Sequence, residues 1–435
     1  MTSVCSSASA ATGAPVNSTG KVVAASLIGT TIEFYDFYIY GIAAALVIGP
    51  MFFPATSEAA QSMAAFMSFG LAFLARPLGA FIFGHFGDRL GRKTTLVASL
   101  MLMGGSTALI GCLPGYDHWG VMAPLALCVL RFCQGLGLGG EWGGAALLAT
   151  ENAPEGKRAW FGMFPQLGPS LGFLLANGVF WGLLVMLGEE AFKDWGWRLP
   201  FLLSAVLVAV GLFVRMSLSE SAVFTKASAS ASAEPRLPFM DVMAHHKRPL
   251  LQGTFAMVAC YALFYTSAVF ALSYGTRSLG YDKQAFLGLL CIAVVFMAIM
   301  TPISAALCDR LGRKPVLIAG MLITIASGLS LGPWLGSGTT VGALAFLCLS
   351  LGAMGLIFAP MGALLPELFP TRVRYTGASA AYNLAGILGA SVAPWVSELL
   401  VAHGGLSWVG GYVSVMALVS LLAVLTLRET RTGTL

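Results

Sequence analysis

The sequence GHFGDRLGRK, residues Gly84 to Lys93, recurs almost unchanged as AALCDRLGRK, residues Ala305 to Lys314. Each copy lies between two apolar segments that are long enough to cross a lipid bilayer. Asp88 and Asp309, at the same place in each copy, are about half a chain length apart. This spacing indicates two related bundles of helices, an arrangement that is typical of membrane proteins that move solutes.

The composition of the chain requires a membrane environment. Of its 435 residues, 57% are hydrophobic and only 10% are charged, whereas soluble domains carry about 25% charged residues. We therefore predict an all-α membrane protein with twelve transmembrane helices in two pseudo-symmetric bundles of six. The expected spans lie near residues 26–49, 62–85, 94–113, 121–148, 160–186, 199–218, 250–273, 284–306, 316–335, 340–363, 375–400 and 407–427.

Polar segments outside these spans divide the chain into five parts. Residues 1–20 are rich in Ser, Ala and Thr and predict a disordered cytoplasmic tail. Residues 220–248 form the longest polar stretch, with alternating Ala and Ser, and predict a cytoplasmic linker. We expect the N-terminal six-helix bundle at 21–219, the C-terminal six-helix bundle at 249–428 and a second cytoplasmic tail at 429–435.

The net charge of +5 has a topological explanation. With an even number of spans, most Lys and Arg residues of the loops fall on the side that holds both termini. The positive-inside rule places this side in the cytoplasm, so we predict a multi-pass protein of the bacterial cytoplasmic (inner) membrane. The lipid bilayer is its solvent, and the charge implies no nucleic-acid partner. Because the cysteines and histidines lack metal-ligand spacing, we expect no metal and no cofactor, with a proton gradient as energy source.

A second charged segment is also repeated between the two halves. The pattern Glu-x-x-Pro-x-x-x-Arg runs from Glu151 to Arg158 and again from Glu367 to Arg374, each time between the fourth and fifth helices of a half. Charged loops in register across both halves suit ion pairs that form when the cytoplasmic ends of the halves meet. The alternative is that these charges only anchor the topology.

The repeated loop resembles the signature of the major facilitator superfamily, an Asp-Arg-x-Gly-Arg-Lys loop between helices 2 and 3 that returns between helices 8 and 9. Both copies keep every motif residue from the Asp onward, although Cys308 replaces the Gly found at position 87. The resemblance implies that Asp88 lies near Arg372 or Arg374, and by symmetry that Asp309 lies near Arg158. The expected cytoplasmic gate comprises Asp88, Arg89, Arg92, Glu151, Arg158, Asp309, Arg310, Arg313, Glu367, Arg372 and Arg374.

Four further segments narrow the resemblance. They are GTTIEFYDFYIYG in helix 1 (Gly29 to Gly41), RFCQGLGLGGEWGGA in helix 4 (Arg131 to Ala145), WGWRLPF at the start of helix 6 (Trp195 to Phe201) and LPELFPTRVRYTG after helix 10 (Leu365 to Gly377). Together they are similar to the bacterial metabolite:proton symporter family, which includes carriers of 2-oxoglutarate, citrate, shikimate and proline or betaine. The resemblance covers nearly the whole chain and implies a proton-coupled carrier, but the substrate differs within that family.

Several ionisable side chains are expected inside the bilayer, where each costs about 2.5–3.5 kcal/mol. Counting about 1.5 Å per residue from the cytoplasmic helix ends places Glu33, Arg76 and Glu141 near the midplane. Asp36 follows Glu33 by three residues and shares its helix face, while Arg131 lies in the outer half of helix 4. Two interpretations stay open, which are ion pairs that hold helices together and a working site in a shared polar cavity.

In a working site, a poorly hydrated cavity favours the neutral form of a carboxyl, which binds and releases a proton as its surroundings change. We therefore predict that Glu33, Asp36 or Glu141 carries the proton. Arginine keeps its charge and its planar fork grips a carboxylate, so we predict Arg76 or Arg131 as the anion ligand. The candidate substrate contacts at similar depth are Tyr35, Tyr38, Gln134, Gln166, Tyr261, Tyr265, Tyr382 and Asn383.

The predicted function is a proton-coupled symporter, active as a monomer, that imports a small organic acid by alternating access. Two alternatives use the same fold: uptake of a zwitterionic osmolyte, whose cationic amine would pair with Glu33, and proton-driven export of an anionic or amphiphilic compound. A membrane sensor or enzyme is a third alternative, but the sequence holds no nucleophile or metal constellation that supports it. The expected partners are a small organic anion or zwitterion and a proton.

Overall fold

The computed structural model describes residues 19–54, 57–90, 92–139, 141–151, 153–216 and 238–431. Within these ranges a few side chains are not described, including those of residues 84–90, 92–96 and 372. The described chain is helical and contains no strand. Eleven of its helices are long and apolar enough to span a membrane, and the shorter apolar helix Val97–Cys112 supplies a twelfth segment. The predicted all-α fold with twelve transmembrane helices is confirmed.

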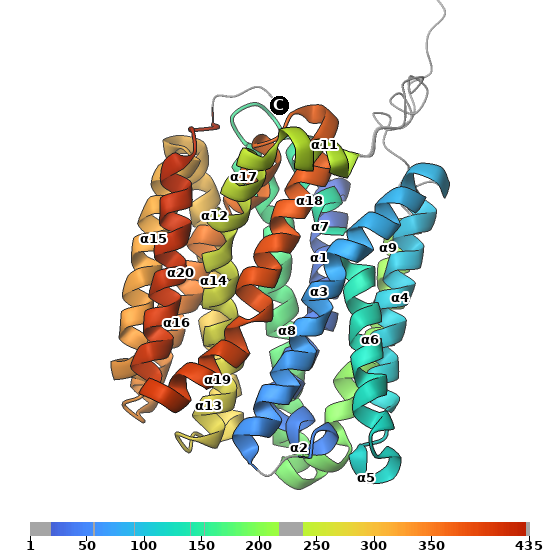
Figure 1. The fold of residues 1–435 in the computed structure, drawn as a ribbon, viewed down its shortest axis with the longest axis vertical. Helices are drawn as coiled ribbons and strands as arrows, with labels where there is room; N and C mark the ends of the chain where they lie inside the picture. Colours follow the sequence, from blue (N-terminus) through green and yellow to red (C-terminus); the bar gives the residue numbers. More distant parts are fainter. Residues whose placement is uncertain are drawn as a thin grey trace, which may run out of the picture.

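The first half of the chain, coloured blue to green in Figure 1, forms six helical columns. Two columns consist of consecutive helices, because π-helical or irregular residues interrupt them. Their bounds are α1 (Thr19–Ala43) with η1 (Ala44–Ile48) and α2 (Gly49–Phe52), α3 (Glu58–Leu90), α4 (Arg92–Cys112), α6 (Met122–Leu138) with α7 (Glu141–Glu151), α8 (Arg158–Asp194) and α9 (Leu199–Met216). The short elements α5 (Tyr116–Trp119) and η2 (Gly196–Arg198) lie in connections.

The second half, coloured yellow-green to red, repeats this arrangement. Its columns are α12 (Lys247–Tyr265) with η3 (Thr266–Phe270) and α13 (Ala271–Arg277), α14 (Lys283–Leu311), α15 (Arg313–Ser330) with η4 (Leu331–Leu335), α16 (Thr340–Phe358) with α17 (Met361–Glu367), α18 (Arg374–Ala385) with η6 (Gly386–Ser391) and α19 (Ala393–Gly404), and α20 (Leu406–Thr426). The short helix η5 (Thr371–Val373) precedes α18.

The first column of each half lies in the centre of the molecule. In the most apolar window of Ser26–Phe52 and of Lys247–Arg277, 94% of the residues are buried, against 33–56% in the other candidate spans of the described chain. Both columns contain a π-helical turn, η1 in the first half and η3 in the second. The halves meet where α8 packs against α14 and where α3 packs against η6. Because π turns often occur at functional sites, the centre is the place where a site is expected.

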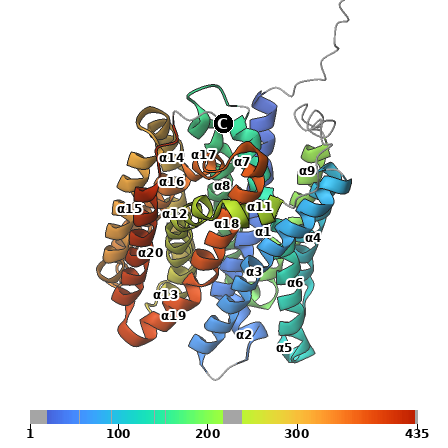
Figure 2. The ribbon, with the colours of Figure 1, turned by 45° about the horizontal axis from the view of Figure 1, so that its top comes forward.

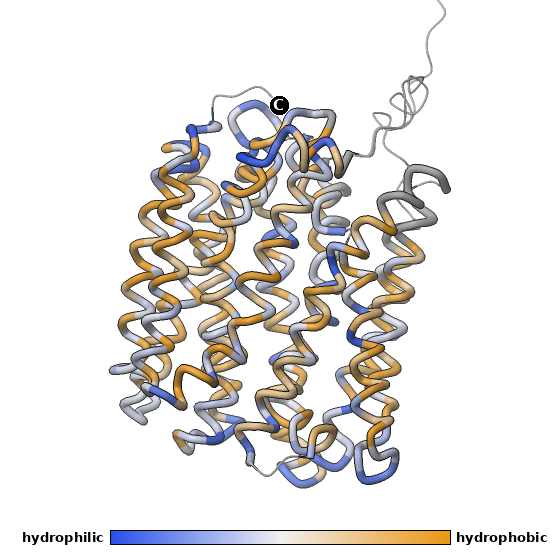
Figure 3. Tube along the Cα trace, in the orientation of Figure 1, coloured by the Kyte–Doolittle hydropathy of each residue, from blue (hydrophilic) through white to orange (hydrophobic). Residues whose placement is uncertain are grey.

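Apolar residues follow the middle of the helical columns, and hydrophilic residues gather at both ends (Figure 3). One end, called the inner end below, holds α11 (Pro238–His245), which packs against α18 and η5 (Figures 1 and 2). This helix lies within the predicted linker 220–248, whose residues 220–237 lie outside the described residues. Thr19 and Gly20, assigned to the N-terminal tail, begin α1, and residues 1–18 lie outside the described part.

Candidate functional site

Arg76 is the charged residue of α3 at the contact between the halves, and it is only 3% exposed. Its guanidinium carbon lies 5.2 Å from the ring centre of Tyr382, 5.5 Å from that of Phe73 and 5.9 Å from that of Phe37. Its Nε atom has no hydrogen-bond partner among the described residues. Ring faces stabilise a buried cation, but they leave N–H donors of the guanidinium available to a ligand.

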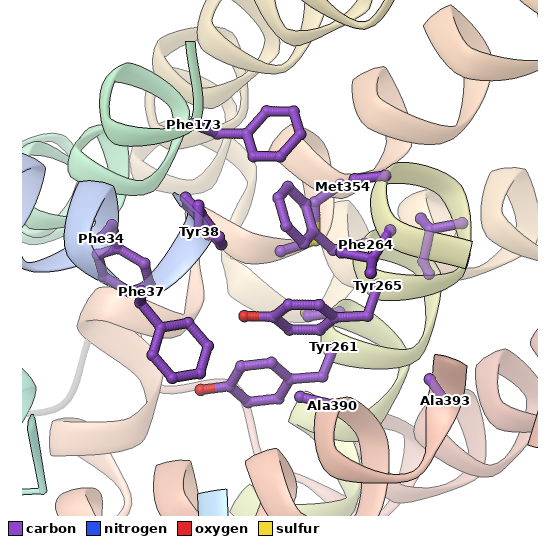
Figure 4. Packing of buried hydrophobic residues seen from close by; sticks show 14 of the residues in the cluster. Phe34, Phe37, Tyr38, Phe173, Tyr261, Phe264, Tyr265, Met354, Ala390 and Ala393 are labelled. Atoms are coloured by element: carbon purple, nitrogen blue, oxygen red, sulfur yellow. The ribbon is translucent and has the colours of Figure 1, made fainter. Parts of the chain in front are cut away.

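Aromatic side chains from both halves surround Arg76. The ring of Tyr265 in α12 lies 5.5 Å from that of Phe73, and the ring of Tyr38 in α1 lies 5.1 Å from that of Phe264. In Figure 4 the hydroxyl end of Tyr265 points from α12 toward the side chains of α1. We call the following six residues the aromatic cage: Phe37, Tyr38, Phe73, Tyr261, Tyr265 and Tyr382.

Polar atoms of the aromatic cage and its border lack partners. The hydroxyls of Tyr261 and Tyr382 are buried and interact with each other and with Arg76 electrostatically, but they lie outside hydrogen-bonding geometry with every described residue, as does the side-chain oxygen of Asn383. The rings of Tyr261 and Tyr382 are 5.5 Å apart, so their hydroxyls belong to one site. Buried polar groups in native proteins are normally paired with protein or water. Such a group of unpaired atoms beside Arg76 indicates a place for a polar ligand.

A layer of bonded side chains separates the aromatic cage from the inner end. The indole ring of Trp142 in α7 stacks on Tyr382 with ring centres 3.9 Å apart, and its Nε1 donates to Gln166 over 2.8 Å. Gln166 in α8 donates to the carbonyl oxygen of Phe358 in the other half, also over 2.8 Å. Asn383 donates to the carbonyl of Gly139 over 3.1 Å. Gln166 and Asn383 therefore tie the two halves together, so their predicted role as substrate contacts has a structural alternative.

Asp36 is the most isolated acid of the membrane interior. It is 0% exposed, and both carboxylate oxygens lack a hydrogen-bond partner in the described part of the chain. The hydroxyl of Ser204 in α9 and the carboxyl of Glu141 in α7 act on it electrostatically, although the Ser204 hydroxyl lies outside hydrogen-bonding geometry. Because an unpaired carboxylate is costly to bury, this surrounding favours the protonated, neutral form of Asp36.

Glu33 and Glu141, the other two predicted acids, are buried but have interactions of their own. Glu141 accepts a hydrogen bond of 2.7 Å from the hydroxyl of Ser99 in α4. Glu33 acts electrostatically on Tyr382 and so lies near the aromatic cage. All three acids are buried in the first half, and of the three it is Asp36 whose two oxygens both lack a hydrogen-bond partner among the described residues.

Arg131 contacts some of the same rings as Arg76, because its guanidinium carbon lies 5.2 Å from the ring centre of Phe37 and 5.3 Å from that of Phe69. Its Nε atom likewise has no hydrogen-bond partner among the described residues. Arg131 stacks on the ring of Tyr40 at 3.8 Å and donates to the carbonyl of Phe69 over 3.1 Å. It also donates to the side-chain oxygen of Gln134, whose nitrogen donates to the backbone carbonyl of Asp36 over 2.8 Å. Arg131 and Gln134 therefore connect α6 to α3 and α1, which matches the alternative of a structural role.

Tyr35 also lies outside the aromatic cage. Its hydroxyl donates to the carbonyl of Pro200 over 2.9 Å and so connects α1 to α9 within the first half. Depth along a helix follows from the constant rise per residue, but the direction of a side chain depends on how the helix is rotated against its neighbours. For this reason the sequence grouped Tyr35 and Arg131 with residues that the structure places in the cage.

At the inner end, Asp309 of α14 binds the start of α8 in the other half. Its carboxylate accepts hydrogen bonds from the backbone N–H groups of Ala159, over 3.0 Å, and Trp160, over 2.9 Å. Arg313 joins the same group, because it forms ion pairs with Glu367 over 2.9 Å and with Asp309 over 3.4 Å. A carboxylate at the N-terminus of a helix is stabilised by the free N–H groups and the helix dipole. Asp309 thus lies one residue from Arg158, the first residue of α8.

A second inner contact joins Arg374 of α18 to Glu151 of α7 over 3.8 Å. We call the Asp309, Arg313 and Arg374 contacts the inner closure. Arg310 is exposed on the surface of α14. The side chains of four predicted gate residues lie outside the described residues: Asp88, Arg89, Arg92 and Arg372.

Glu429 is an inner-end residue that the sequence did not single out, because it was assigned to a tail. Its carboxylate accepts hydrogen bonds from the backbone N–H groups of Arg313, over 2.9 Å, and Lys314, over 3.0 Å, at the start of α15. Burial opposes ionisation of Glu429, but these bonds and one from the Arg431 N–H outweigh it and lower its pKa. Thr430 donates to Glu367 and extends the contact. The sequence did offer one signal for this role, because Glu429 is an acid that directly follows the last span and lies among basic residues.

At the opposite, outer end, Arg277 of α13 forms a bidentate ion pair with Glu398 of α19, over 2.7 and 3.0 Å. The same guanidinium donates to the hydroxyl of Ser62 and to the carbonyl of Glu58 in the other half, the latter over 3.4 Å. Glu398 is buried and Arg277 is partly buried. The sequence analysis missed this pair, although an acid inside the expected span 375–400 could have suggested it.

Two further contacts close the outer half of the interface. Asn177 of α8 donates to the carbonyl of Leu287 in α14 over 2.6 Å, and Ser391 of η6 donates to the carbonyl of Gly70 in α3 over 3.2 Å. Together with the Arg277 contacts they form what we call the outer closure. Among the described residues, the two halves are therefore in contact at both ends of the aromatic cage, a state that we call closed.

Comparison with known proteins gives the family. The model for "Sugar (and other) transporter" matches residues 21–236, and that for "Major Facilitator Superfamily" matches residues 254–434. The chain is 52% identical to the inner membrane metabolite transport protein YhjE of Escherichia coli (strain K12), with 96% of each chain covered. It is 37% identical to the shikimate transporter of the same organism, with 93% of this chain and 94% of that one covered.

Similarity also extends to more distant proteins. The proline/betaine transporter of Escherichia coli (strain K12) is 30% identical, with 94% of this chain and 83% of that one covered. Among solved structures, a partially occluded inward-open form of the xylose transporter XylE from E. coli superposes with a TM-score of 0.72 at 18% identity, over 96% of this chain and 99% of that one.

The twelve-helix fold with a closed central site defines a membrane transporter rather than an enzyme. More particularly, the chain belongs to the major facilitator superfamily, as predicted, and its relatives are metabolite transport proteins. It is a transporter of metabolites.

Proposed function

We propose that the protein is a proton-coupled symporter that imports a small organic acid by alternating access. It works as a monomer in the bacterial cytoplasmic membrane, with both termini in the cytoplasm and the proton gradient as its energy source. The observation that carries the proposal is the state of Arg76, which is a buried cation held between ring faces with an unpaired Nε. A carboxylate is the ligand that best complements such a guanidinium.

The surroundings of Arg76 supply the remaining contacts of a bound acid. The unpaired hydroxyls of Tyr261 and Tyr382 are able to donate to carboxylate oxygens or to hydroxyl groups of the solute. The rings of the aromatic cage suit an apolar or cyclic body. Because Arg76 belongs to the first half and Tyr261 and Tyr382 to the second, a solute that binds all three joins the halves. Binding of this kind stabilises the closed state through which the solute must pass.

We assign the proton to Asp36. In the closed structure its carboxyl has no hydrogen-bond partner among the described residues, so the neutral form is favoured. Water that reaches this side chain from the inner end after opening would stabilise the carboxylate and release the proton. After release of the solute and the proton, the empty carrier must return to the outward-open state through the closed state. Burying an ionised Asp36 in that closed state is costly, and this cost couples solute import to proton import.

The assignment of Asp36 is tested with solute flux in proteoliposomes. Asp36→Asn imitates the neutral form, so we expect it to abolish proton-driven accumulation and to retain solute exchange across the membrane. Glu141→Gln, which alters an acid already bonded to Ser99, should keep proton dependence. Uphill accumulation by the Asp36→Asn protein would exclude this role.

Two alternatives share this site. The names of relatives include a shikimate transporter and a proline/betaine transporter, and shikimate is an anion whereas proline and betaine are zwitterions. The aromatic cage and Glu33 could hold the cationic group of a zwitterion, and the same fold could run as a proton-driven exporter of an anionic or amphiphilic compound. Export predicts that the expressed protein confers resistance and supports growth on no organic acid.

A thermal-shift screen of the purified protein against organic acids, amino acids and betaines identifies the ligand. We expect an organic acid to stabilise the protein and Arg76→Gln to weaken its affinity on the order of 10- to 100-fold, because a charge-assisted hydrogen bond contributes about 1.5–3 kcal/mol. Arg310→Gln, which removes the same charge from the exposed surface, is the matched control. Equal affinity of the wild type and the Arg76→Gln protein would contradict the proposal.

A further inference from the structure

The outward face of α11 carries apolar side chains that the described residues leave exposed. Val242 is buried against the bundle, whereas Met240 is 63% exposed and Met243 is 42% exposed on the opposite side. Basic side chains directly follow these methionines at the junction with α12, and they are also exposed. The exposed basic residues are His245, Lys247 and Arg248.

The position of α11 places this face at the membrane boundary. The transmembrane span Lys247–Arg277 begins two residues after α11 ends, and α11 lies across the end of the bundle beside α18 (Figures 1 and 2). A short helix at this level meets the headgroup region, where apolar side chains enter the lipid and Lys and Arg reach the phosphates. In the headgroup region the two exposed methionines can bury their apolar side chains in lipid, whereas in water this apolar surface would be unfavourable.

The charge of the segment identifies the kind of lipid. In residues 238–248 the one acid is Asp241, and its carboxylate already binds the Nδ1 atom of His245 over 2.9 Å. Lys247 and Arg248 have no such carboxylate beside them in the sequence, so the surface is positive. The cytoplasmic leaflet carries anionic lipids that attract basic residues next to a span.

We propose that α11 and the first turn of α12 bind the headgroup of an anionic phospholipid. Its phosphate lies against Lys247 and Arg248, and its acyl region covers Met240 and Met243. The inference rests on the proposed function only in placing this end in the cytoplasm. Because α11 packs against η5 and α18, and α18 begins with Arg374 of the inner closure, the bound lipid braces one of the contacts that close the inner end.

The test is hydrogen–deuterium exchange of the full chain in nanodiscs of phosphatidylcholine with and without phosphatidylglycerol. We expect the peptide that covers residues 238–248 to exchange more slowly when phosphatidylglycerol is present. Lys247→Gln with Arg248→Gln should remove this difference and lower the affinity for the lipid about thirtyfold, from about 1 kcal/mol for each charge. High salt should weaken the protection as well.

Matched variants separate a specific site from general attraction. Arg310→Gln with Arg428→Gln removes two exposed charges from the same end and should keep the difference. Met240→Ser with Met243→Ser should weaken protection without changing its salt dependence. Melting temperatures show whether each variant is folded.

Equal exchange in both lipids, or the same loss in the Arg310 and Arg428 control, would overturn the proposal. Both leaflets of a nanodisc hold the same lipid, so this result is independent of the orientation and of the transported solute. Failure of the lipid site is therefore distinguishable from failure of the proposed function.

Discussion

The inner and outer closures hold the same two halves together by different means. The inner closure crosses between the halves at two described places: Asp309 binds the start of α8, and Arg374 pairs with Glu151. Arg313 supports the first of these from within the second half, because it pairs with both Asp309 and Glu367. The outer closure combines the guanidinium of Arg277, which binds Glu398 and reaches across to Ser62, with the uncharged contacts of Asn177 and Ser391. We infer that opening of the inner end separates several charged groups, whereas the charged part of the described outer closure depends on Arg277.

A native cysteine can be used to measure the relative populations of the outward-open and inward-open states. The thiol of Cys291 in α14 accepts a hydrogen bond of 3.1 Å from Asn177 in α8, within the outer half of the interface. The thiol is partly buried here. Separation of the halves at the outer end breaks this contact and exposes the thiol further, whereas opening at the inner end leaves its exposure unchanged. In a protein whose other cysteines are replaced by Ser, the rate of maleimide labelling at Cys291 therefore follows the outward-open population.

The largest effect is expected for Arg277→Ala. Removing one partner of a buried ion pair leaves the other charge uncompensated and costs about 3–5 kcal/mol, so Glu398 favours the hydrated, outward-open state. We expect the open population to rise by about two or more orders of magnitude, with faster labelling of Cys291 and loss of transport. The double variant Arg277→Gln with Glu398→Gln removes both charges and should recover slow labelling. Unchanged labelling in Arg277→Ala would show that the outer end does not depend on this residue.

Gly362→Ala should shift the balance in the opposite direction. A Cβ at Gly362 would lie 2.3 Å from the carbonyl oxygen of Gly162, so the inner ends of α17 and α8 could no longer approach. Overpacking of this kind costs about 1–3 kcal/mol, and we expect slower labelling of Cys291 and an inward-open bias. The matched control is Gly352→Ala, whose Cβ would meet only Met300 at 3.8 Å. Faster labelling of Cys291 in Gly362→Ala would contradict the expectation that close packing of α17 against α8 stabilises the closed inner end.

Asp309→Ala is expected to have a smaller effect, because the Arg374–Glu151 pair is unaffected and Arg313 keeps Glu367 after it loses Asp309. Loss of a carboxylate at a helix N-terminus costs about 1 kcal/mol, which corresponds to a change of about fivefold in the labelling rate of Cys291. Asp309→Asn retains one oxygen, which can accept from either the Ala159 or the Trp160 N–H group but not replace both acceptors, so its effect should lie between those of the wild type and Asp309→Ala. If Asp309→Ala changed the labelling rate of Cys291 by as large a factor as Arg277→Ala, the idea that the inner closure is distributed over several contacts would be refuted.

The smallest effect is expected for Glu429→Gln, and it depends on pH. Because the folded protein lowers the pKa of Glu429 below its ordinary value of 4.5, the carboxylate stabilises the fold fully above about pH 4.5. This contribution is lost as the pH falls through the lowered pKa. The wild type should therefore melt slightly above Glu429→Gln at neutral pH, with a difference that is constant down to about pH 5.5 and vanishes in acid. A difference that grows in acid would contradict this sign.

The sequence was sufficient to predict the columns of the fold because hydropathy and length determine a span without knowledge of its neighbours. The sequence also predicted that Glu33, Arg76 and Glu141 lie inside the bundle rather than at its ends, and all three are buried. The sequence does not show how each helix is rotated about its axis against its neighbours. For this reason it could not decide whether Arg76 or Arg131 is the anion ligand. Only packing shows that Arg131 stacks on Tyr40 while Arg76 faces the cage of both halves.

Pairings between distant segments were the other limit. Arg277 and Glu398 are 121 positions apart, and no local pattern brings them together. The charged inner motifs were found because each occurs twice, whereas the outer pair occurs once and offers no internal repeat for comparison. Glu429 was overlooked for a related reason, since its partners are backbone N–H groups that leave no trace in the sequence.

The stack of Trp142 on Tyr382 provides an intrinsic optical signal for the transport cycle. In the closed protein the indole lies face to face with the phenol ring and donates to Gln166. When the two halves separate at the inner end, the Tyr382 ring moves away from Trp142 and water reaches the indole. Contact with water shifts the emission of Trp142 to longer wavelength. The chain has nine tryptophans, so the difference between wild type and Trp142→Phe isolates this contribution. Inner-end opening thus becomes measurable in real time without an attached dye.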